Sequence, residues 1–161
     1  MNTRTAVPRH RDTRKPALFQ QGFRPFFLFA GLWAVLAVPL WLLVFMGGMV
    51  LPTTFGFVAW HTHEMIFGYA GAVVAGFLLT AIPNWTGRRP LQGLPLAGLF
   101  GCWFLGRLAM AGSEYLGALG TAFVDLAFPA LLLAVALREI LAGRNWRNLP
   151  MMAGLGLLIA A

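Results

Sequence analysis

The sequence predicts an all-α protein, a polytopic helical membrane bundle with four complete transmembrane helices and a truncated fifth. Of its 161 residues, 59% are apolar and only 11% are charged, whereas a soluble domain carries about 25% charged residues. The charges are also segregated, because Glu64 is the only charged side chain between Pro25 and Gly87. So few charges cannot cover a water-exposed surface, which places the chain in a bilayer. A single cysteine excludes an internal disulfide and a cysteine zinc site.

The N-terminal segment, residues 1–24, is predicted to be a basic cytoplasmic tail. It holds six of the 12 Lys and Arg residues in a chain whose net charge is +7. Basic residues next to apolar spans are typical of the cytoplasmic side of a membrane. The tail lacks the interleaved aromatic residues of a nucleic-acid-binding surface, so we expect no nucleic-acid partner.

Five apolar segments make up the predicted bundle, residues 25–161, and the lipid bilayer is its expected surroundings. The segments lie at about residues 26–47, 58–83, 94–111, 116–137 and 149–161. The first four reach the ~20 residues that a helix needs to cross the hydrocarbon core. The fifth is too short to cross it. We therefore expect the chain to be the N-terminal portion of a longer protein, with the missing C-terminal spans as partners.

The loops alternate in charge and thereby predict the orientation of the bundle. Arg88 and Arg89 lie between the second and third segments, and three arginines lie between residues 138 and 147. The two remaining loops carry only Glu114. Positive loops stay in the cytoplasm, so the N-terminus is expected there.

Five ionisable residues fall within the spans, and the topology places all of them in the outer half of the membrane: His61, His63, Glu64, Arg107 and Asp125. Charges in hydrocarbon are unfavourable unless they are paired. We therefore expect Arg107 to pair with Asp125 or with Glu114. The group forms either a functional site on the extracytoplasmic side or a set of structural ion pairs.

His61 and His63 raise the question of a metal site, since imidazole binds haem iron, copper and zinc. Residues two apart on a helix are rotated by about 200° and point to opposite sides. On an extended segment the same two side chains would converge and could share one metal. We expect the helix, with His61 on the face of Glu64. The alternative to a metal role is a cluster bonded to loop carbonyls.

Three motifs resemble those of the NnrS family. They are Gly-Phe-Arg-Pro-Phe-Phe at 22–27, Trp-His-Thr-His-Glu-Met at 60–65 and Phe-Leu-Leu-Thr-Ala-Ile-Pro-Asn-Trp-Thr-Gly at 77–87. The resemblance extends from Gly22 to the end of the chain. It implies a bacterial inner-membrane protein with about a dozen spans. Such proteins contain haem and copper and take part in nitric oxide metabolism and protection from nitrosative stress.

The resemblance also implies roles for particular residues. His61 and His63 become candidate haem or copper ligands, and Glu64 becomes a partner that fixes a histidine tautomer. Nitric oxide, or another small diatomic molecule, is the implied ligand. Further histidines of the family lie in later spans. Three more residues belong to family motifs without an assigned role: Arg24, Asn84 and Trp85.

Two other hypotheses compete with a metalloprotein, and no catalytic residue is predicted under any of them. In a secondary transporter or a proton or ion relay, Glu64 and His61 would act with the Arg107/Asp125 pair. In a purely structural membrane subunit, the histidines would only anchor the helices. Visible colour discriminates among these hypotheses, because a haem protein is coloured when purified.

Overall fold

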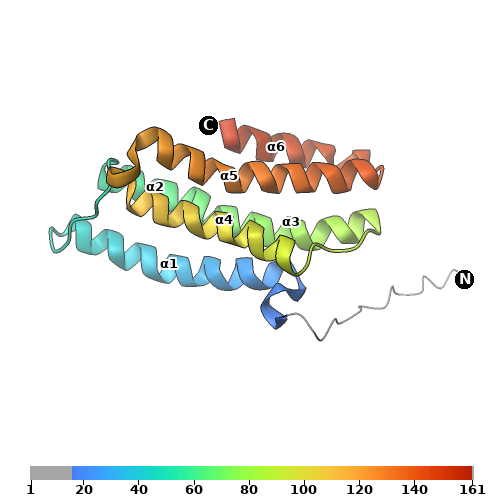
Figure 1. Cartoon of the computed structure of the whole chain (residues 1–161), viewed down its shortest axis with the longest axis horizontal. Coiled ribbons are helices and arrows are strands. Elements are labelled where there is room, and N and C mark those ends of the chain that lie inside the picture. The colour runs from blue at the N-terminus through green and yellow to red at the C-terminus, as the bar shows by residue number, and fades with distance from the viewer. Residues whose placement is uncertain (1–15, 161) are drawn as a thin grey trace, which may run out of the picture.

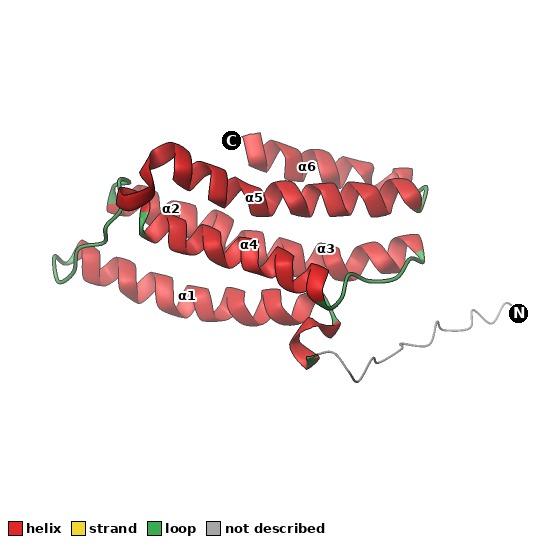
Figure 2. Cartoon of the chain, viewed as in Figure 1, coloured by secondary structure: helices red, strands yellow, loops and turns green. Residues whose placement is uncertain are grey.

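The structure, a computed structural model, describes residues 16–160, and all regular elements in that range are helical (Figure 1, Figure 2). Their bounds, in chain order, are η1 Ala17–Gln20, α1 Phe23–Phe45, α2 Phe57–His63, η2 Glu64–Ala70, α3 Gly71–Thr86, α4 Leu94–Ala111, α5 Ser113–Ala142, η3 Trp146–Asn148 and α6 Leu149–Ala160. The element η2 is a π-helix that joins α2 to α3.

The predicted all-α membrane fold is confirmed. Four helical segments are long and apolar enough to cross a membrane: Phe23–Phe45, Phe57–Thr86, Leu94–Ala111 and Ser113–Ala142. They lie side by side in a bundle (Figure 1). The fifth apolar segment forms α6, whose 12 residues extend for about 18 Å, less than a hydrocarbon core. The division into tail and bundle stays a prediction, and residues 1–15 of the tail lie outside the described residues.

Three spans differ from their predicted bounds, because the first begins at Phe23, the second ends at Thr86 and the fourth covers Ser113–Ala142. The fourth span begins at Ser113 rather than near residue 116, and Gly117, with φ of +70°, interrupts its first turns. Glycine tolerates this left-handed φ without the steric penalty that a side chain imposes. The α1 helix begins at Phe23, inside the predicted tail. Gly87 follows the end of the second span and adopts φ of +68°. The Gly87 N–H is bonded to the carbonyl of Pro83 at 2.9 Å, and this bond caps α3.

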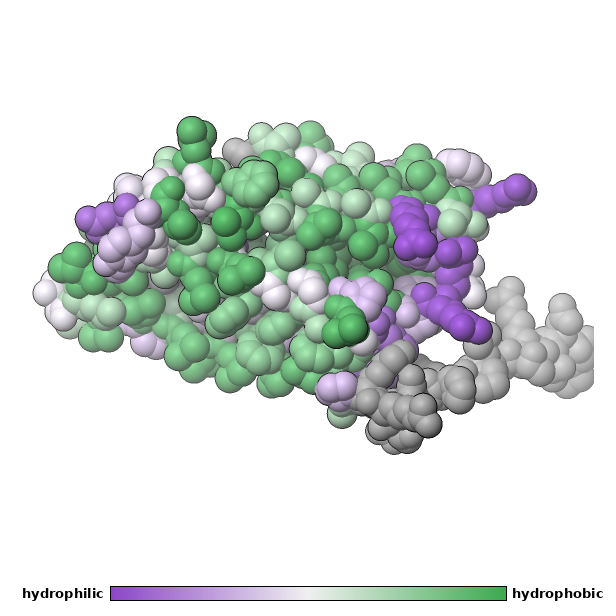
Figure 3. Space-filling view, in the orientation of Figure 1, coloured by the Kyte–Doolittle hydropathy of each residue, from purple (hydrophilic) through white to green (hydrophobic). Residues whose placement is uncertain are grey.

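The core of the bundle is apolar, and so is its outer surface. Phe26, Leu96 and Leu132 are fully buried among α1, α4 and α5, whereas Val35 is 70% and Phe123 is 82% exposed. Figure 3 shows apolar side chains along the full visible flank of the bundle. Large apolar surfaces of this kind are typical of contact with lipid. The bilayer is therefore the environment of this fold.

The exposed arginines of the described residues gather at one end of the bundle, which we call the basic end. It is formed by η1, the end of α3, the α3–α4 connection and the end of α5 (Figure 3). Hydrogen bonds tie these parts together. The Gly93 N–H is bonded to the Phe19 carbonyl at 2.8 Å, and Asn145 Nδ2 donates to the Trp85 carbonyl at 2.8 Å. The positive loops thus share one end, as the charge alternation predicts.

Candidate functional site

A buried ion-pair network lies between the second, third and fourth spans. Arg107 of α4 donates from Nη1 to Glu64 Oε2 at 2.9 Å and from Nη2 to Asp125 Oδ1 of α5. The exposed fractions of Arg107, Glu64 and Asp125 are 1%, 0% and 4%. The expected pairing of Arg107 with Asp125 is therefore present, and Glu64 joins it. One guanidinium neutralises part of the charge of two carboxylates, which is how ionised groups are retained in an apolar interior.

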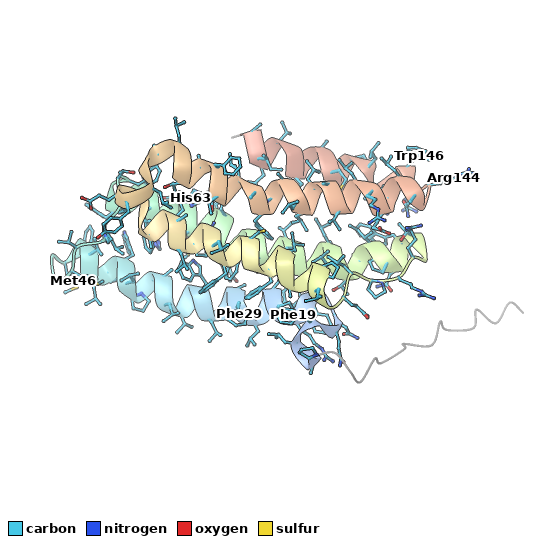
Figure 4. All side chains as sticks on the ribbon, in the orientation of Figure 1. Phe19, Phe29, Met46, His63, Arg144 and Trp146 are labelled. Atoms are coloured by element: carbon cyan, nitrogen blue, oxygen red, sulfur yellow. The ribbon has the colours of Figure 1, made fainter. Side chains whose placement is uncertain are left out.

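Two more side chains complete the network. Trp33 of α1 donates its indole N–H to Glu64 Oε2 at 2.8 Å. The His63 ring lies between the two carboxylates, with Nδ1 3.4 Å from Glu64 Oε1 and Nε2 3.2 Å from Asp125 Oδ2. We call these five residues the Arg107 cluster: Trp33, His63, Glu64, Arg107 and Asp125. Figure 4 places His63 near the end of the bundle opposite to Arg144 and Trp146.

Glycines allow the four spans to approach closely enough to form this cluster. A Cβ atom on Gly68 would lie 2.7 Å from Trp33 Nε1 and 2.8 Å from Glu64 Oε2. A Cβ atom on Gly106 would lie 2.7 Å from Asp125 Oδ1. Gly68 also lies in the π-helical segment, where its carbonyl accepts a hydrogen bond from Trp103 Nε1 at 2.9 Å. Single π-helical turns within a longer helix are frequent at functional sites.

His61 lies in a different environment from His63. Its ring stacks on Trp41 of α1, with centroids 4.3 Å apart and an interplanar angle of 19°. Its Nδ1 atom is buried and has no hydrogen-bond partner among the described residues. The two histidines therefore diverge, as a helix predicts. No group of three or more His, Cys, Asp and Glu side chains within residues 16–160 is arranged to hold a metal ion.

The placement of His61 on the face of Glu64 stays a prediction, and the imidazole that lies beside the Glu64 carboxylate is that of His63. The prediction assumed an uninterrupted α-helix, in which residues three apart share a face. The helix changes to π geometry at Glu64, directly after the α2 helix that carries both histidines. His61 is left on the face that packs against Trp41.

The three family-motif residues make structural contacts at the basic end. Arg24 Nη1 donates to the Ala17 carbonyl at 2.8 Å and links η1 to α1. Asn84 Nδ2 donates to the Thr80 carbonyl at 3.1 Å, and the Trp85 ring packs against Phe77. Twenty helical residues, or about 30 Å, separate Asn84 from Glu64. The structure therefore does not bring these three residues together with the histidines.

Sequence reasoning missed the tryptophans around the histidines. Trp33, Trp41 and Trp103 lie in apolar runs, where an indole is indistinguishable from a core or lipid-facing side chain. The available signal was chemical, since a buried indole N–H usually finds an acceptor. The second span packs against α1 and holds one carboxylate, Glu64, which is therefore the obvious acceptor for the indole N–H of Trp33.

The fold and this cluster define the class of protein, a multi-pass helical membrane protein with paired charged residues buried inside its bundle. A family model described as NnrS protein matches residues 17–161. The chain belongs to the NnrS family. No curated protein and no solved structure matches it.

Proposed function

We propose that this chain is part of a haem- and copper-binding bacterial inner-membrane protein of nitric oxide metabolism and nitrosative stress protection. Membership of the NnrS family supports this class of function. The observation that carries the metal proposal is the free imidazole of His61, whose buried Nδ1 has no hydrogen-bond partner among the described residues. A buried nitrogen without a partner is unfavourable unless another group, such as a metal, engages that nitrogen.

His61 is the better metal ligand of the two histidines. The stacked Trp41 ring fixes the plane of its imidazole, and no described side chain hydrogen-bonds to its Nδ1. Both ring nitrogens of His63, by contrast, lie within 3.2–3.4 Å of carboxylate oxygens. Ligation by His63 would remove it from the Arg107 cluster. We therefore assign ligation to His61 and give His63 a structural role.

The residues present fit one ligand position rather than a complete cofactor site. One imidazole supplies one axial ligand of a haem or one ligand of a copper ion. The cavity beside the Arg107 cluster measures about 10 Å³, which is room for about one water molecule. Because no group of three or more His, Cys, Asp and Glu side chains within residues 16–160 could hold a metal ion, we place the remaining ligands outside the described residues. When bound, the haem or copper would supply binding of nitric oxide or another diatomic molecule, or electron transfer.

The charge distribution supports a metal position near the extracytoplasmic end of the second span. His61 lies in α2, at the end of its span that is distant from Arg88 and Arg89. Positive residues favour the cytoplasmic side, so the opposite end faces outward. A ligand at that end would face molecules on the extracytoplasmic side of the membrane.

The geometry does not favour the transporter or relay hypothesis in its expected form. That hypothesis needs His61 next to Glu64 and the Arg107/Asp125 pair. No hydrogen bond or ion pair among residues 16–160 joins His61 to the cluster. The carboxylates are instead held by fixed donors from α1 and α4.

The experiment that tests the proposal separates the two histidines. His61→Ala and His63→Ala would each be introduced into the full-length protein and purified beside the wild type. Reduced-minus-oxidised visible spectra and metal analysis would be recorded for each. We expect His61→Ala to lose haem bands or copper with unchanged helical content, and His63→Ala to retain them. Thr62→Ala, an exposed change between the two, is the control.

Three outcomes would count against the assignment. Loss of the cofactor from His63→Ala alone would reverse the roles of the histidines. Full retention in both variants would place the ligands outside the second span. A colourless and metal-free wild type, expressed with ample haem supply, would contradict cofactor binding and favour the transporter hypothesis.

A further inference from the structure

A second cavity lies at the basic end, far from the histidines. Its volume is about 260 Å³, and it lies between the end of α3, the α3–α4 connection and α5. Leu79, Ile82, Leu91 and Val135 form its apolar walls. This volume is several times that of a water molecule, which occupies about 30 Å³ in the liquid. The cavity is therefore large enough for part of an organic molecule.

Charged side chains line the same cavity. Arg88 Nε is paired with Glu139, and Arg89 is exposed. Arg89 makes no hydrogen bond or ion pair that the structure shows with any residue in the range 16–160. Two guanidinium groups and one carboxylate leave the lining with one net positive charge. A phosphodiester, with one negative charge, matches that net charge.

The cavity also lies next to the end of the second span, where we expect the lipid headgroups. The second span ends at Thr86, and the chain leaves the helix at Gly87, so Arg88 and Arg89 follow directly after the hydrocarbon region. Basic pockets at this level of a helical bundle suit anionic lipid headgroups. The apolar walls lie on the membrane side of the arginines, along the α3 turn that contains Leu79 and Ile82.

We propose that this cavity binds one anionic phospholipid, with its phosphate at Arg89 and Arg88 and its apolar portion against Leu79, Ile82 and Val135. Free phosphate would gain the same attraction to the arginines but nothing from the apolar walls. A phospholipid uses both, because burial of its hydrocarbon adds to the charge attraction. Glu139 opposes the anion, so it also sets how tightly the lipid is held.

The test measures lipid binding to the full chain in detergent by native mass spectrometry. The protein would be delipidated and titrated with phosphatidylglycerol, with phosphatidylcholine, and with inorganic phosphate. We expect one phosphatidylglycerol to bind more tightly than phosphatidylcholine. Arg89→Gln should weaken binding about fivefold, the usual effect of one basic residue near anionic lipid. Glu139→Gln should strengthen it by removing the opposing carboxylate.

Arg147→Gln is the matched control, since it removes the same charge from the basic end but does not line the cavity. We expect it to leave the affinity for phosphatidylglycerol within twofold of the wild type. Equal weakening by Arg147→Gln and Arg89→Gln would overturn the site in favour of diffuse attraction. Equal binding of phosphatidylcholine would also overturn it. Displacement of the lipid by inorganic phosphate alone would show a free-anion site instead. Helical content from circular dichroism confirms that each variant is folded.

Discussion

Arginines at the two ends of the bundle are used in opposite ways. Arg107 is 1% exposed, and its Nη atoms are held by Glu64 and Asp125 on two other spans. Arg89 is exposed and has no partner shown in the described part of the chain. A buried charge that is paired with fixed counter-charges stabilises the fold, whereas an exposed and unpaired charge remains available to bind an external anion. The comparison predicts that removal of Arg107 lowers the stability of the fold, whereas removal of Arg89 weakens anion binding.

The largest effect is expected from Arg107→Met. This change leaves two carboxylates in an apolar interior with no guanidinium, and loss of one partner of a buried ion pair destabilises by about 3–5 kcal/mol. The free energy of unfolding would be measured by SDS titration of the protein in mixed micelles. Arg89→Met, the same change at the basic end, should alter it by less than about 0.5 kcal/mol. Similar losses in the two variants would contradict the comparison.

Asp125→Asn should be less harmful than Arg107→Met. It removes one of two negative charges and leaves Arg107 paired with Glu64. The cluster is then neutral, whereas the Arg107→Met cluster carries two negative charges. We expect a loss of about 1–3 kcal/mol, the effect of a weakened buried polar contact. In the same titration, the Arg107→Met/Asp125→Asn double variant should lose less stability than the sum of the two single variants. Simple additivity would show that the two residues act independently.

Backbone proximity at the cluster is tested by Gly68→Ala. The new Cβ atom would lie 2.7 Å from Trp33 Nε1 and 2.8 Å from Glu64 Oε2, and overpacking of this kind destabilises by about 1–3 kcal/mol. Gly101→Ala in α4 is the control, because nothing lies within 4 Å of its Cβ position. Alanine favours a helix over glycine by about 1 kcal/mol. The control should therefore be neutral or stabilising, and an equal loss in both variants would contradict the close approach.

The sequence predicts the spans well but the site only in part. The spans depend on the local apolar sequence, whereas the site depends on packing between spans. The helix Leu94–Ala111 has the predicted bounds, because apolar length is a local property that the bilayer selects. The Arg107–Asp125 contact was also predictable, since a charge in hydrocarbon needs a partner at the same depth. The π-helical turn at Glu64 arises from packing between spans, and no local pattern indicates it. The position of His63 between Glu64 and Asp125 was therefore not indicated by the sequence.

A small effect on stability is also expected at the Arg88–Glu139 pair, where an arginine of the basic end has a counter-charge. Arg88 is 40% exposed and Glu139 is 21% exposed, and solvent-exposed ion pairs contribute about 0–1 kcal/mol. Arg88→Gln should therefore change the free energy of unfolding by less than about 1 kcal/mol, measured by SDS titration at low and at high salt. The difference between wild type and variant should shrink at high salt, because ions screen exposed charges. A loss of unfolding free energy as large as that of Arg107→Met, and unaffected by salt, would mean that the basic end is held by buried ion pairs like those of the interior. Its arginines would then not be free to bind an anion.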